Sequence, residues 1–259
     1  MNRGIGVSRP HTLRGFPAGW IDWGRIDFEA VLGHAATAFA GEPIAVVARS
    51  VGGLLIGLTP SNHRIHRVFT MCAQFAHWPD YSRGHRVRLL LKWHLVMPAL
   101  TTLVGYFPGR RPGWMEDAPC GVVRDWTARS PRFEDAYRRG ARVVPPAEGA
   151  QPARQFAAMA GATLAVSVRD DEFGTIPAIR RLLARFTNSL AVHLQLPPQA
   201  TGVGEIGHHA VFHSRVAQTL GPIARRWLGT GDRDPELTLW VQPKDGGRFG
   251  EPEPGSVTA

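Results

Sequence analysis

The stretch Ala48-Arg49-Ser50-Val51-Gly52-Gly53 follows the apolar run Ile44–Val47 and leads into the apolar run Leu54–Leu58. This order predicts a buried strand, a turn of the form small-x-Ser-x-Gly, and a helix. The turn is so tight that only small residues fit two positions before and two after the serine. It lifts the Ser50 hydroxyl above the sheet and aims the first helical N–H groups at the same place. Ser50 is therefore a candidate nucleophile.

Composition indicates a soluble globular chain. The 259 residues are 44% hydrophobic and 20% charged, and the two cysteines, Cys72 and Cys120, form no disulfide framework or ligand cluster. The first residues lack the apolar core of a secretory signal. The longest apolar stretch, Trp93–Phe107, is interrupted by Pro98 and is shorter than the about 20 residues of a spanning helix. We therefore expect a cytoplasmic protein with no integral membrane segment.

The formal net charge of +9 raises the question of a nucleic-acid partner. The cations are scattered along the chain, and Lys92 and Lys244 are the only lysines. This distribution resembles a coding preference for arginine more than a binding stripe. We expect no nucleic-acid partner; steeply salt-dependent retention on DNA would mark that alternative.

Strands and helices alternate over most of the chain. We expect strands at 44–47, 65–72, 162–168 and 190–196, and helices at 20–39, 51–58, 176–186 and 211–228. Such alternation predicts the α/β class, with a mostly parallel sheet covered on both faces.

The chain divides into four predicted parts. Residues 1–73 and 155–228 carry the strand–helix units of one core. Residues 74–154 interrupt these units with a long, aromatic-rich segment, which we interpret as an inserted helical cap. Residues 229–259 are rich in Gly, Pro and charge, and we expect a disordered tail there.

Partners for a nucleophilic serine follow two later strands. A serine hydroxyl needs an imidazole to take its proton, and the imidazole needs a carboxylate to fix its tautomer. Asp170 and Asp171 follow the strand at 162–168, and His208 and His209 follow the strand at 190–196. Their order in the chain and their positions after strands make coincidence a weak explanation.

The choice within each pair rests on local pattern. Asp171 is favoured as the acid because Glu172-Phe173-Gly174 follows it, and Asp170 remains the alternate acid or the cap of a loop or of the next helix. His208 is favoured as the base because it directly follows Gly207. No metal-ligand spacing is evident, and we expect neither a metal nor a cofactor.

Several strings resemble the bacterial α/β-hydrolases of the esterase/lipase-like type. They are Arg3-Gly4-Ile5-Gly6-Val7-Ser8, Ser50-Val51-Gly52-Gly53, Gly105-Tyr106-Phe107-Pro108-Gly109, Asp170-Asp171-Glu172-Phe173 and Ile206-Gly207-His208. The resemblance extends from the start of the chain to about residue 228. It implies an α/β-hydrolase fold with Ser50, Asp171 and His208 as the triad, and the Val51 N–H as one oxyanion donor. The implied substrate is a small-molecule ester or acyl compound.

The chain departs from the family pattern at two places. Ala48 stands where glycine is usual, a small change. The Arg3–Ser8 string normally follows a strand deep inside the domain, so the resemblance implies that three or four N-terminal strands and one helix are missing, on the order of 70–90 residues. The second oxyanion donor would be lost with them, at a cost of about 100- to 1,000-fold in rate. The open sheet edge would also favour pairing with another copy, a homo-oligomer.

Three readings of function therefore stand. The first is a serine hydrolase that cleaves a carboxylic ester through an acyl-enzyme intermediate. The second is a truncated, inactive pseudohydrolase that serves as an interaction module. The third is an acyltransferase, which uses the same residues and differs only in the acceptor. An in-frame upstream sequence encoding an apolar strand and a Gly-rich loop would favour an active enzyme over the truncated form.

Overall fold

The computed structural model describes residues 2–75, 77–127, 151–202, 204–209, 213–233 and 238–241. The strands are β1 (Ile44–Arg49), β2 (Ile65–Met71), β3 (Ala162–Val168), β4 (Ala191–Leu196) and β5 (Thr238–Val241). The α-helices are α1 (Trp20–Asp22), α2 (Glu29–Ala38), α3 (Val51–Leu58), α4 (Arg86–Leu91), α5 (Met97–Val104), α6 (Cys120–Thr127), α9 (Gln151–Ala158), α10 (Ile176–Leu183) and α11 (Ala217–Thr230). Two π-helical turns, Trp23–Phe28 and Lys92–Val96, join α1 to α2 and α4 to α5.

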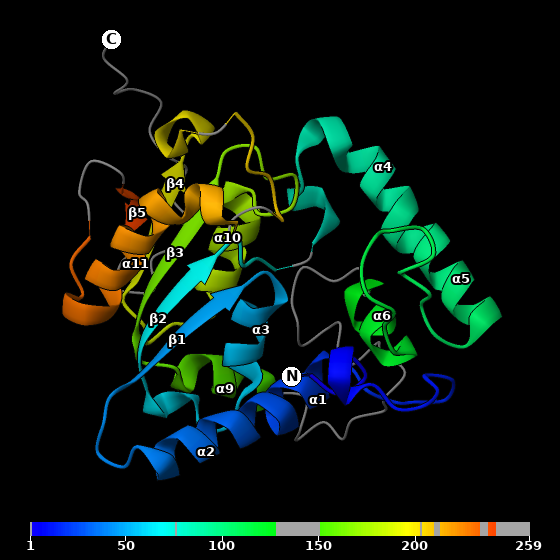
Figure 1. The fold of residues 1–259 in the computed structure, drawn as a ribbon, viewed down its shortest axis with the longest axis horizontal. Coiled ribbons are helices and arrows are strands. Elements are labelled where there is room, and N and C mark those ends of the chain that lie inside the picture. Colours follow the sequence, from blue (N-terminus) through cyan, green and yellow to red (C-terminus); the bar gives the residue numbers. More distant parts are fainter. Residues whose placement is uncertain are drawn as a thin grey trace.

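One sheet holds the five strands in the order β1-β2-β3-β4-β5 (Figure 1). The first four strands run parallel, and β5 is antiparallel to β4. The parallel strands are joined through helices, as their geometry requires. Because all four point the same way, the loops after β1, β3 and β4 meet at one edge of the sheet. The mostly parallel sheet predicted from the sequence is confirmed.

Helices cover both faces of this sheet. On one face, α3, α9 and α10 pack through a cluster that includes Leu54, Phe156 and Leu182. On the other face, α11 packs through a second cluster that includes Leu194 and Trp227. The inner strands β3 and β4 are almost entirely buried for this reason. At the edge strand β1, Ala45 and Val47 are exposed.

The segment predicted as a helical cap contains α4, α5 and α6, which lie beside the sheet (Figure 1). Residues 128–150 of that segment lie outside the described residues. The boundary predicted at residue 154 falls inside α9. This helix packs against α3, and an alanine side chain at Gly57 would lie within 2.1 Å of the Phe156 ring.

Two predicted boundaries near the C-terminus are corrected. The last helix begins at Ala217 instead of residue 211, because the His213 ring accepts the Arg215 N–H and holds a separate 3₁₀ turn, Ser214–Val216. We expected no regular structure after Gly229, but Thr238–Val241 forms β5. The Thr-Leu-Trp-Val sequence suits a strand. A four-residue strand among charged residues and prolines gives too little pattern to be detected.

A longer helix than expected runs through the apolar stretch after Trp93. Residues 83–104 are helical without a break, since Pro98 falls in the first turn of α5, directly after a π turn. In the described part of the chain this is the one helix long and apolar enough, by length and composition, to cross a membrane.

Candidate active site

Ser50 sits at the sharp turn between β1 and α3. Its backbone has a φ of 50° and a ψ of −123°, a conformation that residues other than glycine rarely adopt. Such strain is typical of a serine held for attack at the end of a strand. A side chain at Gly52 would place its Cβ 3.3 Å from the Cβ of Ala48, which explains why both positions carry small residues.

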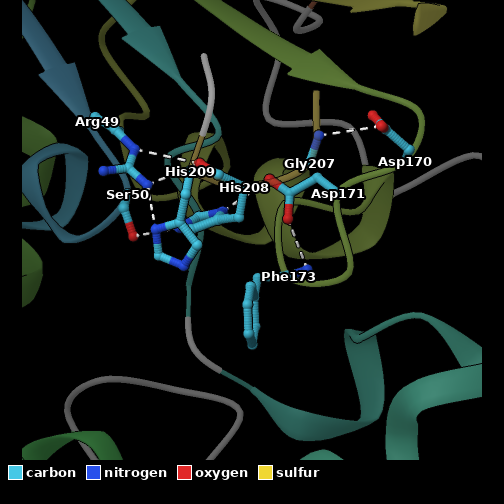
Figure 2. A network of polar contacts seen from close by, with 8 residues as sticks. All are labelled: Arg49, Ser50, Asp170, Asp171, Phe173, Gly207, His208 and His209. Atoms are coloured by element: carbon cyan, nitrogen blue, oxygen red, sulfur yellow. Dashed lines mark hydrogen bonds and ion pairs between the residues drawn. The ribbon is translucent and has the colours of Figure 1, made fainter. Parts of the chain in front are cut away.

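The structure brings Ser50, Asp171 and His208 together (Figure 2). The Ser50 hydroxyl lies 2.9 Å from Nε2 of His208, and Nδ1 of the same ring lies 2.8 Å from Oδ2 of Asp171. Asp171 follows β3, and His208 follows β4. With the proton on Nδ1, the imidazole donates to the carboxylate and accepts the serine hydroxyl, which is the arrangement needed for proton transfer.

Asp171 is buried, yet remains a carboxylate. Burial alone would raise its pKa, but the hydrogen bond and charge of His208, the Gly174 N–H and the Cys72 thiol together lower the pKa below its ordinary value. Its second oxygen accepts the Phe173 N–H at 2.8 Å. A side chain at Gly174 would place its Cβ 2.4 Å from the carboxylate, so glycine leaves the space that the acid needs.

The loop that carries His208 is held at two points by residues adjacent to the other two site residues (Figure 2). Asp170 accepts the backbone N–H groups of Ile206 at 2.7 Å and Gly207 at 3.0 Å. Arg49 donates from Nη2 to the His208 carbonyl oxygen at 2.8 Å, and from Nε to the same oxygen at 3.3 Å. The histidine is thus positioned by hydrogen bonds to its own backbone as well as to its ring.

His209 lies against Arg49 and does not reach Ser50 or Asp171 through any hydrogen bond of the described residues. Its Nδ1 is 2.8 Å from Nη2 of Arg49 and therefore acts as an acceptor. Burial, followed by the charges of His208 and Arg49, lowers the pKa of His209. His209 is thus a second hydrogen-bond acceptor for Arg49, the residue that holds the His208 loop.

Aromatic side chains form a wall beside the histidine. The Phe173 ring meets His208 edge-on, with ring centroids 5.1 Å apart. Trp93 lies 6.1 Å from Phe173 and stacks on Trp126 at 4.9 Å. Trp93 comes from the π turn between α4 and α5, and Trp126 from α6. The described helices of residues 74–127 thus supply apolar surface next to the site.

One group of residues has the chemistry and spacing of a metal site in the described part of the chain: Cys72, Asp171 and His208, whose ligand atoms lie within 4.8 Å of one another. Two of the three already bind each other. Burial, followed by the nearby Asp171 carboxylate, raises the pKa of the Cys72 thiol well above its ordinary value. A protonated thiol is a poor metal ligand. The three residues are therefore better suited to hydrogen bonds around the carboxylate than to binding a cation.

The structure brings together the three residues predicted from the sequence, Ser50, Asp171 and His208. The sequence did not predict which side chains hold these residues in place. Asp171, and not Asp170, contacts His208, while Asp170 holds the loop backbone, as a loop cap would. Val51 is the first residue of α3, directly after Ser50, and its role as an oxyanion donor stays a prediction. Arg49 and Cys72 were missed. The positive φ of Cys72, 51°, is not visible in a sequence.

No protein-family profile matches the sequence, and a search of curated proteins finds no match. Solved structures do match. Monoacylglycerol lipase from Paleococcus ferrophilus is 12% identical, with 78% of this chain and 74% of that chain covered and a TM-score of 0.42. The meta-cleavage product hydrolase from Pseudomonas fluorescens is 15% identical, with 89% and 78% covered and a TM-score of 0.42. Alpha/beta hydrolase domain-containing protein 10 from mouse is 12% identical, with 86% and 74% covered and a TM-score of 0.43.

The class of protein follows from the fold itself. A mostly parallel sheet flanked by helices, with a strained serine turn after one strand and an acid and a histidine after later strands, is the α/β-hydrolase-type fold. The predicted fold class is therefore confirmed.

Proposed function

We propose that this chain is a serine hydrolase that cleaves carboxylic esters through an acyl-enzyme intermediate. The observation that carries the proposal is the hydrogen-bonded series Ser50–His208–Asp171 at a strained strand-to-helix turn. A second Ser–His pair among the described residues, Ser167 and His193 at 2.8 Å, provides an internal comparison. Ser167 has ordinary strand geometry, and both residues are fully buried.

The reaction assigns one role to each residue. Ser50 Oγ forms a bond to the ester carbonyl carbon while its proton moves to Nε2 of His208. Asp171 stabilises the imidazolium that results, and the Val51 N–H donates to the negatively charged oxygen. Breakage of the ester C–O bond releases the alcohol, which takes the proton from His208. Water then repeats the sequence at the acyl group, releasing the carboxylic acid and restoring Ser50.

The aromatic wall supports an apolar substrate group. Phe173 packs edge-on against His208 and Trp93 packs against Phe173, so apolar rings stand beside the place where the acyl or alcohol part of an ester would lie. Apolar rings contribute binding through burial of surface, without fixing a single ligand shape. We propose a small or medium acyl chain as the preferred substrate. A series of p-nitrophenyl esters from acetate to octanoate tests this preference.

Covalent labelling by a fluorophosphonate tests the nucleophile directly. The wild-type chain should be labelled. Ser50→Ala should lose labelling, and its rate of ester hydrolysis should fall at least about 1,000-fold. Ser167→Ala is the matched control and should keep both. Labelling needs a single attack, so it detects the nucleophile independently of the rate of turnover. Equal labelling of the wild-type chain and Ser50→Ala would reject the proposal.

A further inference from the structure

The helical stretch 83–104 carries two apolar rows on opposite sides. The inner row consists of Leu89, Trp93, Met97 and Thr101, all buried. Trp93 reaches α6 through its stacking on Trp126 and reaches Phe173 on the far side. This row accounts for the packing of the helix on the rest of the protein.

The outer row repeats at the same four-residue spacing but faces solvent. Val87 is 71% exposed, Leu91 50%, Leu95 61% and Leu103 81%, and Ala99 between them is also exposed. In Figure 1, α4 and α5 run along the outer margin of the molecule, on the side away from the sheet. Single exposed apolar residues are ordinary, whereas a row of five along more than four turns is a surface that needs a partner.

The π turn reduces the drift of the row around the helix. In a regular α-helix, four residues advance more than one turn, so a four-residue repeat drifts by about 40° at each step. A π turn contains more residues per turn and rotates the chain back. The turn Lys92–Val96 lies in the middle of the stretch and offsets part of this drift. The inner and outer rows therefore drift less across α4 and α5 than they would in an uninterrupted α-helix.

The charge of the helix points to the kind of partner. Residues 83–104 contain four cations and no Asp or Glu, and the cations lie in the first half of the stretch, at Arg83, Arg86, Arg88 and Lys92. Lys92 sits over the rings of Trp93 and Trp114, at 4.5 and 4.3 Å from their centroids. An exposed apolar row on a helix with cations and no carboxylate suits the boundary between anionic headgroups and acyl chains.

We propose that the outer face of this helix docks on a lipid bilayer that contains anionic lipids. A second copy of the chain fits less well, because it would present the same cations and no carboxylate from this helix. The inner row keeps the helix on the protein, so the helix lies in the interface plane and does not span the bilayer. Docking is a binding property and holds whether or not Ser50 is active.

The helix that carries the proposed surface also contacts residues next to the candidate site. Arg88 forms an ion pair at 2.5 Å with Glu172, the residue after Asp171. Trp93 contacts Phe173, which contacts His208. Docking would therefore hold at the membrane a helix whose inner row packs against the aromatic neighbour of the histidine.

Flotation with lipid vesicles tests the surface. The full chain should float with vesicles of phosphatidylcholine and phosphatidylglycerol, and bind at least about tenfold more weakly to phosphatidylcholine alone. The double variant Leu91→Gln/Leu95→Gln should reduce the partition coefficient at least about tenfold, because two inserted apolar side chains are lost. Val31→Gln/Phe39→Gln, which changes exposed apolar residues at α2 and its C-terminal end, is the matched control and should bind as the wild-type chain does.

Circular dichroism checks that each variant is folded, and Leu103→Gln, which changes the most exposed leucine of the row, replaces the double variant if that variant unfolds. The proposal is overturned if the wild-type chain stays unbound on anionic vesicles at low ionic strength, or if the outer-row variants bind as well as the control. It is also overturned if the wild-type chain is a dimer without lipid and the outer-row variant is a monomer, since the row is then an interface between copies.

Discussion

The loop of His208 is positioned by the side chains that precede the nucleophile and the acid. Arg49 holds the His208 carbonyl oxygen, and Asp170 holds the N–H groups of Ile206 and Gly207. Each hydrogen bond involves a charged group and is stronger than a neutral one. The same two residues thus connect the end of β1 and the end of β3 to the loop after β4.

Loss of either charged group should therefore slow the reaction without removing the nucleophile. We expect Arg49→Met and Asp170→Ala each to lower kcat for ester hydrolysis by about 10- to 100-fold, as one or two charge-assisted hydrogen bonds are lost. KM should change less, because neither side chain lies in the aromatic wall. Arg67→Met is the matched control. Arg67 also donates to backbone carbonyl oxygens, those of Leu228 and Gly229, at a distance from the site.

Two further measurements separate positioning from general stability. Guanidinium added to Arg49→Met should restore part of kcat, and should have no effect on Arg67→Met. Asp170→Asn, which keeps an acceptor oxygen, should retain more activity than Asp170→Ala. Equal losses in Arg49→Met and Arg67→Met, with no rescue, would show that Arg49 acts only on folding.

At this scale the sequence was informative where a residue's role depends on its place in the chain. Ser50, Asp171 and His208 were found because their order and the strands before them carry the pattern. The contact of Arg49 with His208 spans 159 positions of sequence and depends on where a loop returns. No local pattern encodes a contact over that distance. In the sequence, Arg49 was therefore only the residue before the serine in the small-x-Ser-x-Gly turn, where any residue type is allowed.

At the scale of elements, β3 and β4 share a buried polar contact. Ser167 on β3 and His193 on β4 are fully buried, 2.8 Å apart between Oγ and Nε2. Burial, followed by the charge of Arg180, lowers the pKa of His193 to about 3. The ring is therefore neutral in the folded protein, whereas in the unfolded chain it titrates near 6.5.

This difference predicts a loss of stability in acid. The folded pKa of a base lies below its unfolded value, so the unfolded chain binds the proton first as the pH falls. The contribution of His193 to the free energy of unfolding is complete above about pH 6.5. It is lost progressively as the pH falls from about 6.5 to about 3. Between pH 8 and pH 5 the free energy of unfolding should fall by about 2 kcal/mol on account of His193 alone.

Urea unfolding of the wild-type chain and His193→Gln at both pH values checks this prediction. Glutamine can still donate to Ser167 but does not titrate, so the variant should be less sensitive to the change in pH. The other titrating groups are common to both proteins and cancel in the comparison. An equal pH dependence in the two proteins would mean that His193 is accessible to protons when folded.

Elements with a strong apolar pattern were predicted closely. β3 and α3 match their predicted ranges because each is bounded by clear turn residues and packs on the sheet. The π turns, β5 and the start of α11 were not predicted. β5 depends on its pairing with β4, which a short segment does not encode, and the start of α11 on a single contact between the His213 ring and the Arg215 N–H.

At the scale of the whole molecule, one sheet joins two hydrophobic clusters. Val68 of β2 belongs to the cluster under α3, and Phe69, the next residue, belongs to the cluster under α11. Ala165 and Leu164 of β3 alternate in the same way. Because neighbouring residues of the same strands pack on opposite faces, neither cluster can come apart while the other keeps the sheet in place.

This arrangement predicts a single cooperative unfolding transition that includes both faces and the site. Leu54→Ala in one cluster and Leu194→Ala in the other should each lower the free energy of unfolding by about 2–5 kcal/mol, since both leucines are buried. In urea, the near-ultraviolet circular dichroism of the tryptophans and the fluorophosphonate labelling of Ser50 should be lost together in both variants, with similar slopes. If Leu194→Ala separated the two signals, so that labelling survived after the α11 face had melted, the two faces would be independent folding units and the sheet would not couple them.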